Sequence, residues 1–150
     1  MIIRHATDTD CSAVASLVRG LSHFYLEDSQ ADLPEWFEVT LTDSSFANRF
    51  NDADYANFVA EREGEIIGYL SIKTGFHLYH CFVASDYHQQ GIATALWRHA
   101  VETLNISYCT VRSSLYAVPV YSRFGFQASG NAATKDGIGY QPMVFGNAIS

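Results

Sequence analysis

Residues 79–101 read YHCFVASDYHQQGIATALWRHAV, and this stretch decides the fold. A short apolar run ends at Val83, a polar turn follows, and residues 88–94 then open an amphipathic helix. A strand, a glycine-bearing loop and a helix start are the elements that proteins use to hold a phosphate group. The N–H groups of a first helical turn point outward and carry the positive end of the helix dipole. We therefore expect a phosphate-binding loop at residues 88–94.

The loop itself does not carry a known phosphate signature. It has neither the GxxxxGK[ST] pattern nor a GxGxxG pattern after a strand. Gly91 and Ala93 are nevertheless small residues at a helix start, where a ligand would have to approach the backbone closely. Taken alone, the loop is also compatible with an ordinary helix N-terminus that contains a glycine.

The elements predicted outward from this stretch follow an order typical of an α/β protein. Apolar residues recur at helical spacing between Val14 and Leu21, behind a Thr7–Asp10 pair that resembles a capping box. Gly125 is expected to end a later short helix as its C-cap. We expect strands at residues 2–5, 55–61, 66–74, 78–83, 107–111 and 139–145, and helices at 8–24, 46–50, 90–104 and 117–124. This order predicts a single domain over residues 1–150, with helices on the faces of a sheet.

Composition and charge exclude several classes of protein. The 150 residues are 48% hydrophobic and 17% charged, as in globular domains, and no apolar run approaches the roughly 18 residues of a membrane span. The net charge of −7 argues against nucleic acid, so we expect neither a membrane nor a nucleic acid as partner. No signal peptide is visible, and we expect a cytoplasmic protein.

Cys11, Cys81 and Cys109 are widely spaced, which predicts reduced thiols and no metal site.

Acidic residues gather in one segment of the chain. Residues 27–65 hold eleven acidic and two basic residues, a net charge of −9, and the rest holds five acidic and seven basic residues, a net charge of +2. Such a segment is either a solvated acidic surface or the rim of a pocket that attracts cationic substrates.

A second stretch, residues 112–126, reads RSSLYAVPVYSRFGF. Together with residues 88–94, it resembles the GNAT superfamily of acetyl-CoA-dependent N-acetyltransferases. The first stretch matches the pyrophosphate-binding pattern Q/R-x-x-G-x-G/A of that family. The second matches its A-x-x-F/L-Y-x-x-x-G-F element, with Ala117, Val120, Tyr121, Gly125 and Phe126 in register. The resemblance covers the whole chain and implies the GNAT fold, a mixed sheet of about six to seven strands flanked by about four helices.

The resemblance also implies where acetyl-CoA would bind. The thioester would lie in a gap between the strand that ends at Val83 and the strand at residues 107–111, with backbone groups of Phe82 and Val83 beside the pantetheine. His88 stands where the family usually has Gln or Arg, and Ser114 where many members have Asn. The implied cofactor contacts are Phe82, Val83, His88, Gln89, Gln90, Gly91, Ile92, Ala93, Thr94 and Ser114. No metal is implied.

The chemistry implied by the resemblance is a direct attack of an amine on the thioester. Tyr121 matches the general acid of the family, since a phenol with a pKa near ~10 can protonate a departing thiolate of pKa ~8.5; a core aromatic is the alternative. Cys81 is expected to be a packed strand residue rather than an acyl carrier. The family often has a Glu base near Val83, and His80 is the candidate base here, with a structural histidine as the alternative.

The acceptor is the least determined part of this interpretation. Tyr25, Glu27 and Trp36 fall where family members shape the acceptor pocket, and the acidic segment favours a cationic primary amine on a small molecule or peptide. Two other interpretations stay open: a non-catalytic acyl-CoA-binding sensor or interaction module on the same fold, and an unrelated α/β scaffold with a chance phosphate loop. The aromatic-rich C-terminal strands permit a homodimer, which is common in the family.

Overall fold

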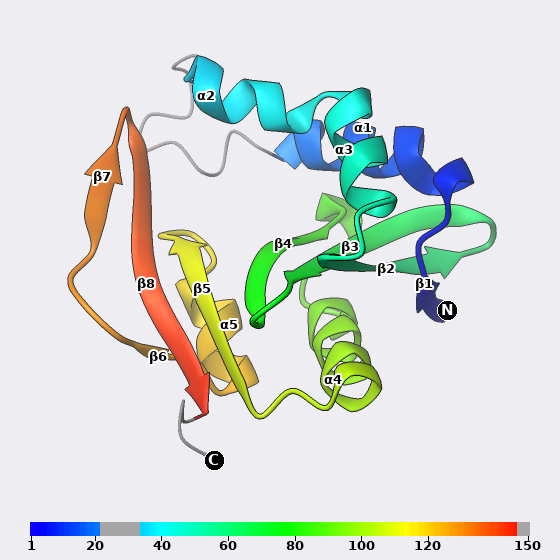
Figure 1. Cartoon of the computed structure of the whole chain (residues 1–150). Coiled ribbons are helices and arrows are strands. Elements are labelled where there is room, and N and C mark those ends of the chain that lie inside the picture. The colour runs from blue at the N-terminus through cyan, green and yellow to red at the C-terminus, as the bar shows by residue number, and fades with distance from the viewer. Residues whose placement is uncertain (22–33, 147–150) are drawn as a thin grey trace.

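The computed structural model describes residues 1–21 and 34–146 (Figure 1). The strands are β1 (Ile2–His5), β2 (Tyr55–Arg62), β3 (Glu65–Lys73), β4 (His77–Val83), β5 (Tyr108–Ser114), β6 (Gln127–Ala128), β7 (Ala133–Lys135) and β8 (Ile138–Gly146). The helices are α1 (Cys11–Leu21), α2 (Glu35–Glu38), α3 (Asp43–Phe50), α4 (Ile92–Leu104) and α5 (Val118–Phe124). Short 3-10 turns lie at Asp8–Asp10, Val39–Leu41 and Ser85–Tyr87.

In this part of the chain, all eight strands form one mixed sheet. The strand order is β1-β2-β3-β4-β5-β8-β6, and β7 also pairs with β8. Every pairing is antiparallel except that of β4 with β5, which are joined through α4 as a parallel pair requires. The predicted mixed sheet is present. The sheet is larger than expected because β6 and β7 have only two and three residues, too few to give a periodic signal.

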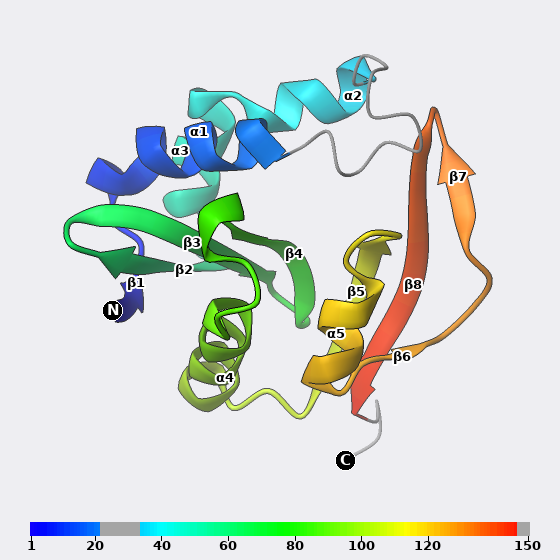
Figure 2. The same cartoon turned by 180° about the vertical axis from the view of Figure 1, so that it is seen from behind.

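Helices cover both faces of the sheet. Figures 1 and 2 show α1 and α3 over one face and α4 and α5 over the other. Each pair of helices closes its own apolar cluster, one built around Phe46, Tyr69 and Phe82 and the other around Leu96 and Trp97. No helix in the described part of the chain is long and apolar enough to cross a membrane.

A β-bulge in β4 separates the two central strands. Ser71 of β3 pairs with His80, but the next residue of β3, Ile72, pairs with Leu78, so Tyr79 is an extra residue. A bulge bends its strand and increases the local twist. The parallel pairing of β4 with β5 ends at Leu78, whereas β5 stays paired with β8 as far as Ser114. The two strands therefore diverge from the bulge onward.

The predicted start of the main helix is corrected by two residues. Residues 90–104 were expected to be helical, but α4 begins at Ile92 because Gly91 has a φ of +77° and Gln89 a φ of +64°, neither of which is helical. Two other local predictions are confirmed. The backbone N–H of Thr7 donates to Oδ2 of Asp10 at 2.8 Å, as in a capping box. Gly125 ends α5 with a φ of +105°.

Candidate active site

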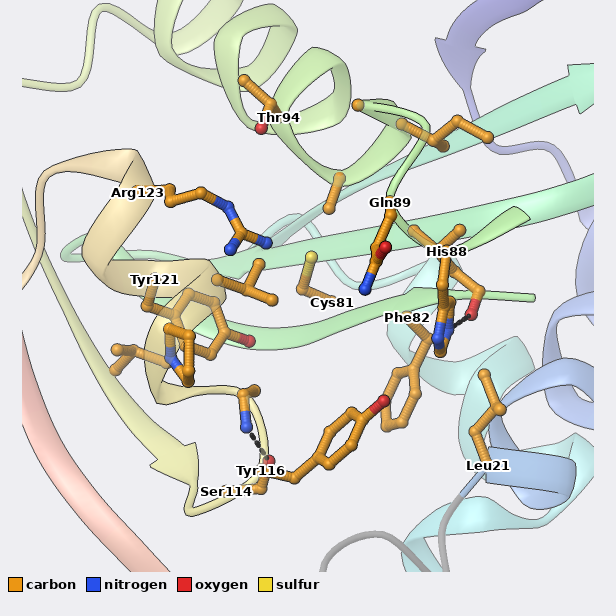
Figure 3. A pocket seen from close by; sticks show the side chains of 18 of the residues that line it. Leu21, Cys81, Phe82, His88, Gln89, Thr94, Ser114, Tyr116, Tyr121 and Arg123 are labelled. Carbon is orange, nitrogen blue, oxygen red and sulfur yellow. Dashed lines mark hydrogen bonds between the residues drawn. The ribbon is translucent and has the colours of Figure 1, made fainter. Parts of the chain in front are cut away.

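A cavity of about 580 Å³ fills the space where β4 and β5 diverge. Its wall includes the end of β4, the loop before α4, the first turn of α4, the end of β5 and one side of α5 (Figure 3). Leu21, at the end of α1, also lines it. Because α1 and α5 lie on opposite faces of the sheet, the residues that line the cavity come from both faces.

The loop before α4 presents backbone N–H groups to this cavity. The N–H of Ala95 is the first in the helix to make a helical hydrogen bond, and it donates to the Gly91 carbonyl at 3.0 Å. The preceding N–H groups of the first turn have no helical acceptor, as at any helix start. A Cβ atom on Gly91 would meet no atom within 4 Å, so the space beside this backbone is open. The arrangement is that of an anion site, with room for a phosphate.

The side chain of His88 points away from this anion site. Its Nε2 lies 2.7 Å from the carbonyl oxygen of Val83. A carbonyl can only accept, so Nε2 carries the proton and donates it. This contact holds the loop against the end of β4. His88 therefore supports the loop through its side chain, and the residue also lines the cavity.

Tyr121 is buried, and its hydroxyl is directed into the cavity. Figure 3 shows this hydroxyl pointing toward Cys81, across the gap from β4. The ring packs against Phe124 and Phe126, each at a centroid distance of 5.7 Å, which fixes its direction. Burial raises the pKa of the Cys81 thiol to about 12, so the thiol is protonated at neutral pH. The site thus contains a directed phenol and no thiolate at Cys81, which fits a direct transfer better than an acyl-cysteine.

His80 lies on the face of the sheet that α1 and α3 cover, and it does not line the cavity. Its ring is surrounded by aromatic rings, with Tyr79, Phe82 and Phe46 at centroid distances of 4.6, 5.6 and 5.8 Å. Neither ring nitrogen has a hydrogen-bond partner among the described residues. Burial, reinforced by the nearby charge of Arg49, lowers the pKa of His80 to about 3. The ring is therefore neutral, and its position gives no support to the predicted role as a base.

This buried histidine predicts a loss of stability in mild acid. Unfolded His80 binds a proton below pH ~6.5, but the folded protein does not until pH approaches 3, so stability present above pH 6.5 is lost as pH falls. The free energy of unfolding is expected to fall by up to about 1.4 kcal/mol per pH unit in this window. His77, whose pKa burial also lowers, adds a smaller effect of the same sign.

Urea unfolding of the wild type and of His80→Leu between pH 7.5 and 4.5 measures this effect. The variant is expected to lose much less stability over that range, while His5→Gln, a change at an exposed histidine, should follow the wild type. The hydrogen bond from Arg4 lowers the pKa of Asp10 below its ordinary value of 3.8. The stability that this carboxylate contributes is therefore lost only at a pH below the range of this experiment. Parallel curves for wild type and His80→Leu would show that His80 is not the source.

The structure brings most of the predicted cofactor contacts together. The wall of the cavity includes Phe82, Val83, His88, Gln89, Gly91, Ile92, Ala93, Thr94 and Ser114, but Gln90 is not part of it. Ser114 Oγ accepts a hydrogen bond from the N–H of Ala117 at 3.1 Å, so this hydroxyl helps to position the start of α5.

Of the predicted acceptor residues, the structure describes Trp36, and Trp36 does not line the cavity. Trp36 donates from Nε1 to Oδ2 of Asp136 at 2.7 Å, and the Lys135 ammonium lies 4.6 Å from its ring, so this part of α2 contacts the turn between β7 and β8. Tyr25 and Glu27 lie outside the described residues.

Two arginines in the wall of the cavity were missed by the sequence analysis. Arg112 and Arg123 are the only side chains in the described lining with a full charge at neutral pH, and no carboxylate is part of it. None of the described acidic residues of the 27–65 segment lines it. In a protein of net charge −7, this cavity is therefore locally positive. Arg123 lies inside the second motif at a position that the family pattern leaves open, and Arg112 precedes Ala117, the first residue of that pattern.

Comparison with known proteins finds the same architecture in acetyltransferases. A family model described as an acetyltransferase (GNAT) domain matches residues 25–146. The chain is similar to the PaiA N-acetyltransferase of Thermoplasma acidophilum in complex with coenzyme A, at 15% identity and TM-score 0.78, over 97% of this chain and 98% of that chain. It is similar to the ribosomal-protein-S18-alanine N-acetyltransferase of Escherichia coli, at 20% identity and TM-score 0.69, over 96% and 92%. A complex of aminoglycoside 6'-N-acetyltransferase with coenzyme A is also similar, at 13% identity and TM-score 0.70, over 96% of each chain. No curated protein matches the sequence.

Proposed function

The chain belongs to the GNAT acetyltransferase family, and on this basis we propose that it transfers an acetyl group from acetyl-CoA to a primary amine. The observation that carries the proposal is the combination found in one cavity. The open N-terminus of α4 lies beside Gly91, and the directed hydroxyl of Tyr121 lies across the gap. The similar structures from Thermoplasma acidophilum and of the aminoglycoside 6'-N-acetyltransferase contain coenzyme A, which supports the same ligand here.

The residues of the cavity fit coenzyme A in two places. The N–H groups at the start of α4 would bind the pyrophosphate, and the Arg123 guanidinium, which Figure 3 shows directed into the cavity, would add a positive charge. Beyond the bulge, the edge of β4 is no longer paired with β5, so backbone groups of Phe82 and Val83 would lie beside the pantetheine as a neighbouring strand does.

The chemical step needs one proton donor from the protein. Acetyl-CoA supplies the acetyl group as a thioester, the amine nitrogen bonds to the carbonyl carbon, and the carbon–sulfur bond breaks. Tyr121 would donate its hydroxyl proton to the sulfur, and the nitrogen would lose one proton to water as the amide forms. Tyr121 would then recover a proton through water. The directed position of the phenol, fixed by Phe124 and Phe126, is what supports this role.

The amine must arrive in its neutral form, since no carboxylate of the described lining can act as its base. A lysine-like amine with a pKa near ~10.4 is almost entirely charged at pH 7, whereas about a tenth of an α-amino group with a pKa near ~7.7–8 is free. We therefore propose that the amine loses its proton to water, which favours acceptors with the more acidic α-amino type of group.

Calorimetric titration with acetyl-CoA, followed by an assay of thiol release with a panel of amines, tests the proposal. Binding together with turnover is the expected result. Binding without turnover on any amine would favour a non-catalytic acyl-CoA sensor, an interpretation that the missing carboxylate base makes reasonable. Failure of acetyl-CoA to bind at all would refute the proposed function and leave only the fold.

A further inference from the structure

The two arginines of the cavity lie on opposite faces of the sheet, and they are suited to different ligands. Val111 of β5 packs with α4 and α5, and side chains alternate along a strand, so Arg112 projects from the opposite face. The pairing of β5 with β4 agrees with this direction. Leu78 pairs with Val111, and both pack with α4 and α5. His77 pairs and hydrogen-bonds with Thr110, whose side chain is on the same face of β5 as that of Arg112. Arg123 lies on α5, on the face that holds the start of α4.

Arg123 is therefore the arginine on the side of the anion site, and Arg112 is the arginine on the side of α1. The guanidinium of Arg112 lies 5.7 Å from the ring centroid of Tyr140, and the residue is exposed. The three ion pairs found in the described residues involve Arg4 and Arg19, not Arg112. A guanidinium placed against an aromatic ring keeps its in-plane N–H groups available for a carboxylate, which it can bind through two parallel hydrogen bonds.

We propose that Arg112 binds a carboxylate on the acceptor, so that the acceptor is an amine that also carries an anionic group, such as an amino acid. This inference rests on the proposed acetyl transfer. It replaces the cationic acceptor expected from the acidic segment, since the described acidic residues of that segment lie outside the cavity and the charge found there is positive. Positions 27, 28 and 32, the remaining acidic residues of the segment, lie outside the described residues.

Matched pairs of amines with and without a carboxylate test this inference directly. Tyrosine with tyramine, leucine with 3-methylbutylamine and lysine with cadaverine differ only by that group. Binding to the CoA-saturated protein and kcat/KM with acetyl-CoA are measured for each member. In at least one pair, the carboxylate member is expected to bind and react better, and Arg112→Gln should reduce that advantage roughly 10- to 100-fold.

The variants separate the two arginines and control for general effects. Arg112→Gln should leave the affinity for acetyl-CoA unchanged, whereas Arg123→Gln should weaken it. Arg98→Gln, at an exposed arginine of α4 outside the cavity, should change neither property. Arg112→Lys should restore only part of the preference, because an ammonium group cannot form the two parallel hydrogen bonds.

Several results would overturn the inference. Equal or better binding of the decarboxylated amine in every pair, absence of binding by all carboxylate members, or an equal loss for both members in Arg112→Gln would each do so. A loss of acetyl-CoA affinity in Arg112→Gln would assign this arginine to the cofactor instead. Failure of the proposed function is distinguishable from all of these, because it appears as failure of the wild type to bind acetyl-CoA or as binding of acetyl-CoA without turnover on any amine.

Discussion

Replacing Gly91 by glutamate is expected to raise the Kd of the protein for acetyl-CoA by at least about 100-fold, because like charges brought together at a binding site cost several kcal/mol. The added side chain starts in the open space beside the first turn of α4, where we propose that the pyrophosphate binds. A carboxylate there occupies the volume of the ligand and repels its negative charge. Isothermal titration calorimetry on the wild type and the variant measures the change.

Two glycines elsewhere in the chain provide matched controls for this substitution. Gly64 and Gly75 have φ values of +80° and +85°, close to the +77° of Gly91, and a Cβ on either would also meet no atom within 4 Å. Gly64→Glu and Gly75→Glu therefore introduce the same charge and similar backbone strain, about 1 kcal/mol, away from the cavity. Wild-type affinity in Gly91→Glu, with the variant shown to be folded, would contradict the proposed pyrophosphate site.

Tyr121→Phe is expected to lower kcat by about 100-fold or more, with little change in the affinity for acetyl-CoA. General acid catalysis typically contributes 10²- to 10⁴-fold, and the substitution removes only the hydroxyl that faces the cavity. The ring contacts with Phe124 and Phe126 remain, so α5 should keep its position. Steady-state assays of thiol release, together with calorimetric titration, separate the effect on chemistry from any effect on binding.

The tyrosine substitution also has an internal control. Tyr108→Phe removes a phenol from β5 outside the cavity and should leave kcat unchanged. If Tyr121→Phe retained wild-type kcat, the leaving thiolate would not need a proton from this residue, and Tyr121 would be only a packed aromatic. If kcat and acetyl-CoA affinity fell together, the hydroxyl would have a role in binding rather than in proton transfer.

The parts of the fold that sequence predicted well are those with long periodic patterns. The helix expected at 90–104 and the hairpin expected at 55–61 and 66–74 appear as α4 and as β2 with β3, with small shifts at their ends. Both present continuous apolar faces to a core, so tertiary packing reinforces the local pattern. The four-residue helix α2 and the short strands β6 and β7 gave no such pattern, because so few residues cannot define a period.

Sequence analysis predicted the glycine loop and the tyrosine of the candidate site, but it missed the two arginines that give the cavity its charge. The glycine loop and Tyr121 belong to recognisable motifs, and both line the cavity. His80 illustrates what sequence could not provide. In a regular strand Leu78, His80 and Phe82 would share one face, but the bulge at Tyr79 places Leu78 with α4 and α5 and Phe82 with α1 and α3. No local sequence pattern in β4 predicts this change of face.

The bulge at Tyr79 also makes this strand unusually sensitive to length. Loss of a single codon at that position would give β4 a regular register with β3, and the residues on one side of the deletion would exchange faces. The parallel ladder with β5 could then continue past Leu78 into the space where the two substrates are proposed to meet. Insertions and deletions in β4 should therefore be tolerated far less than substitutions, since the opening through the sheet depends on the number of residues in the strand as well as on their identity.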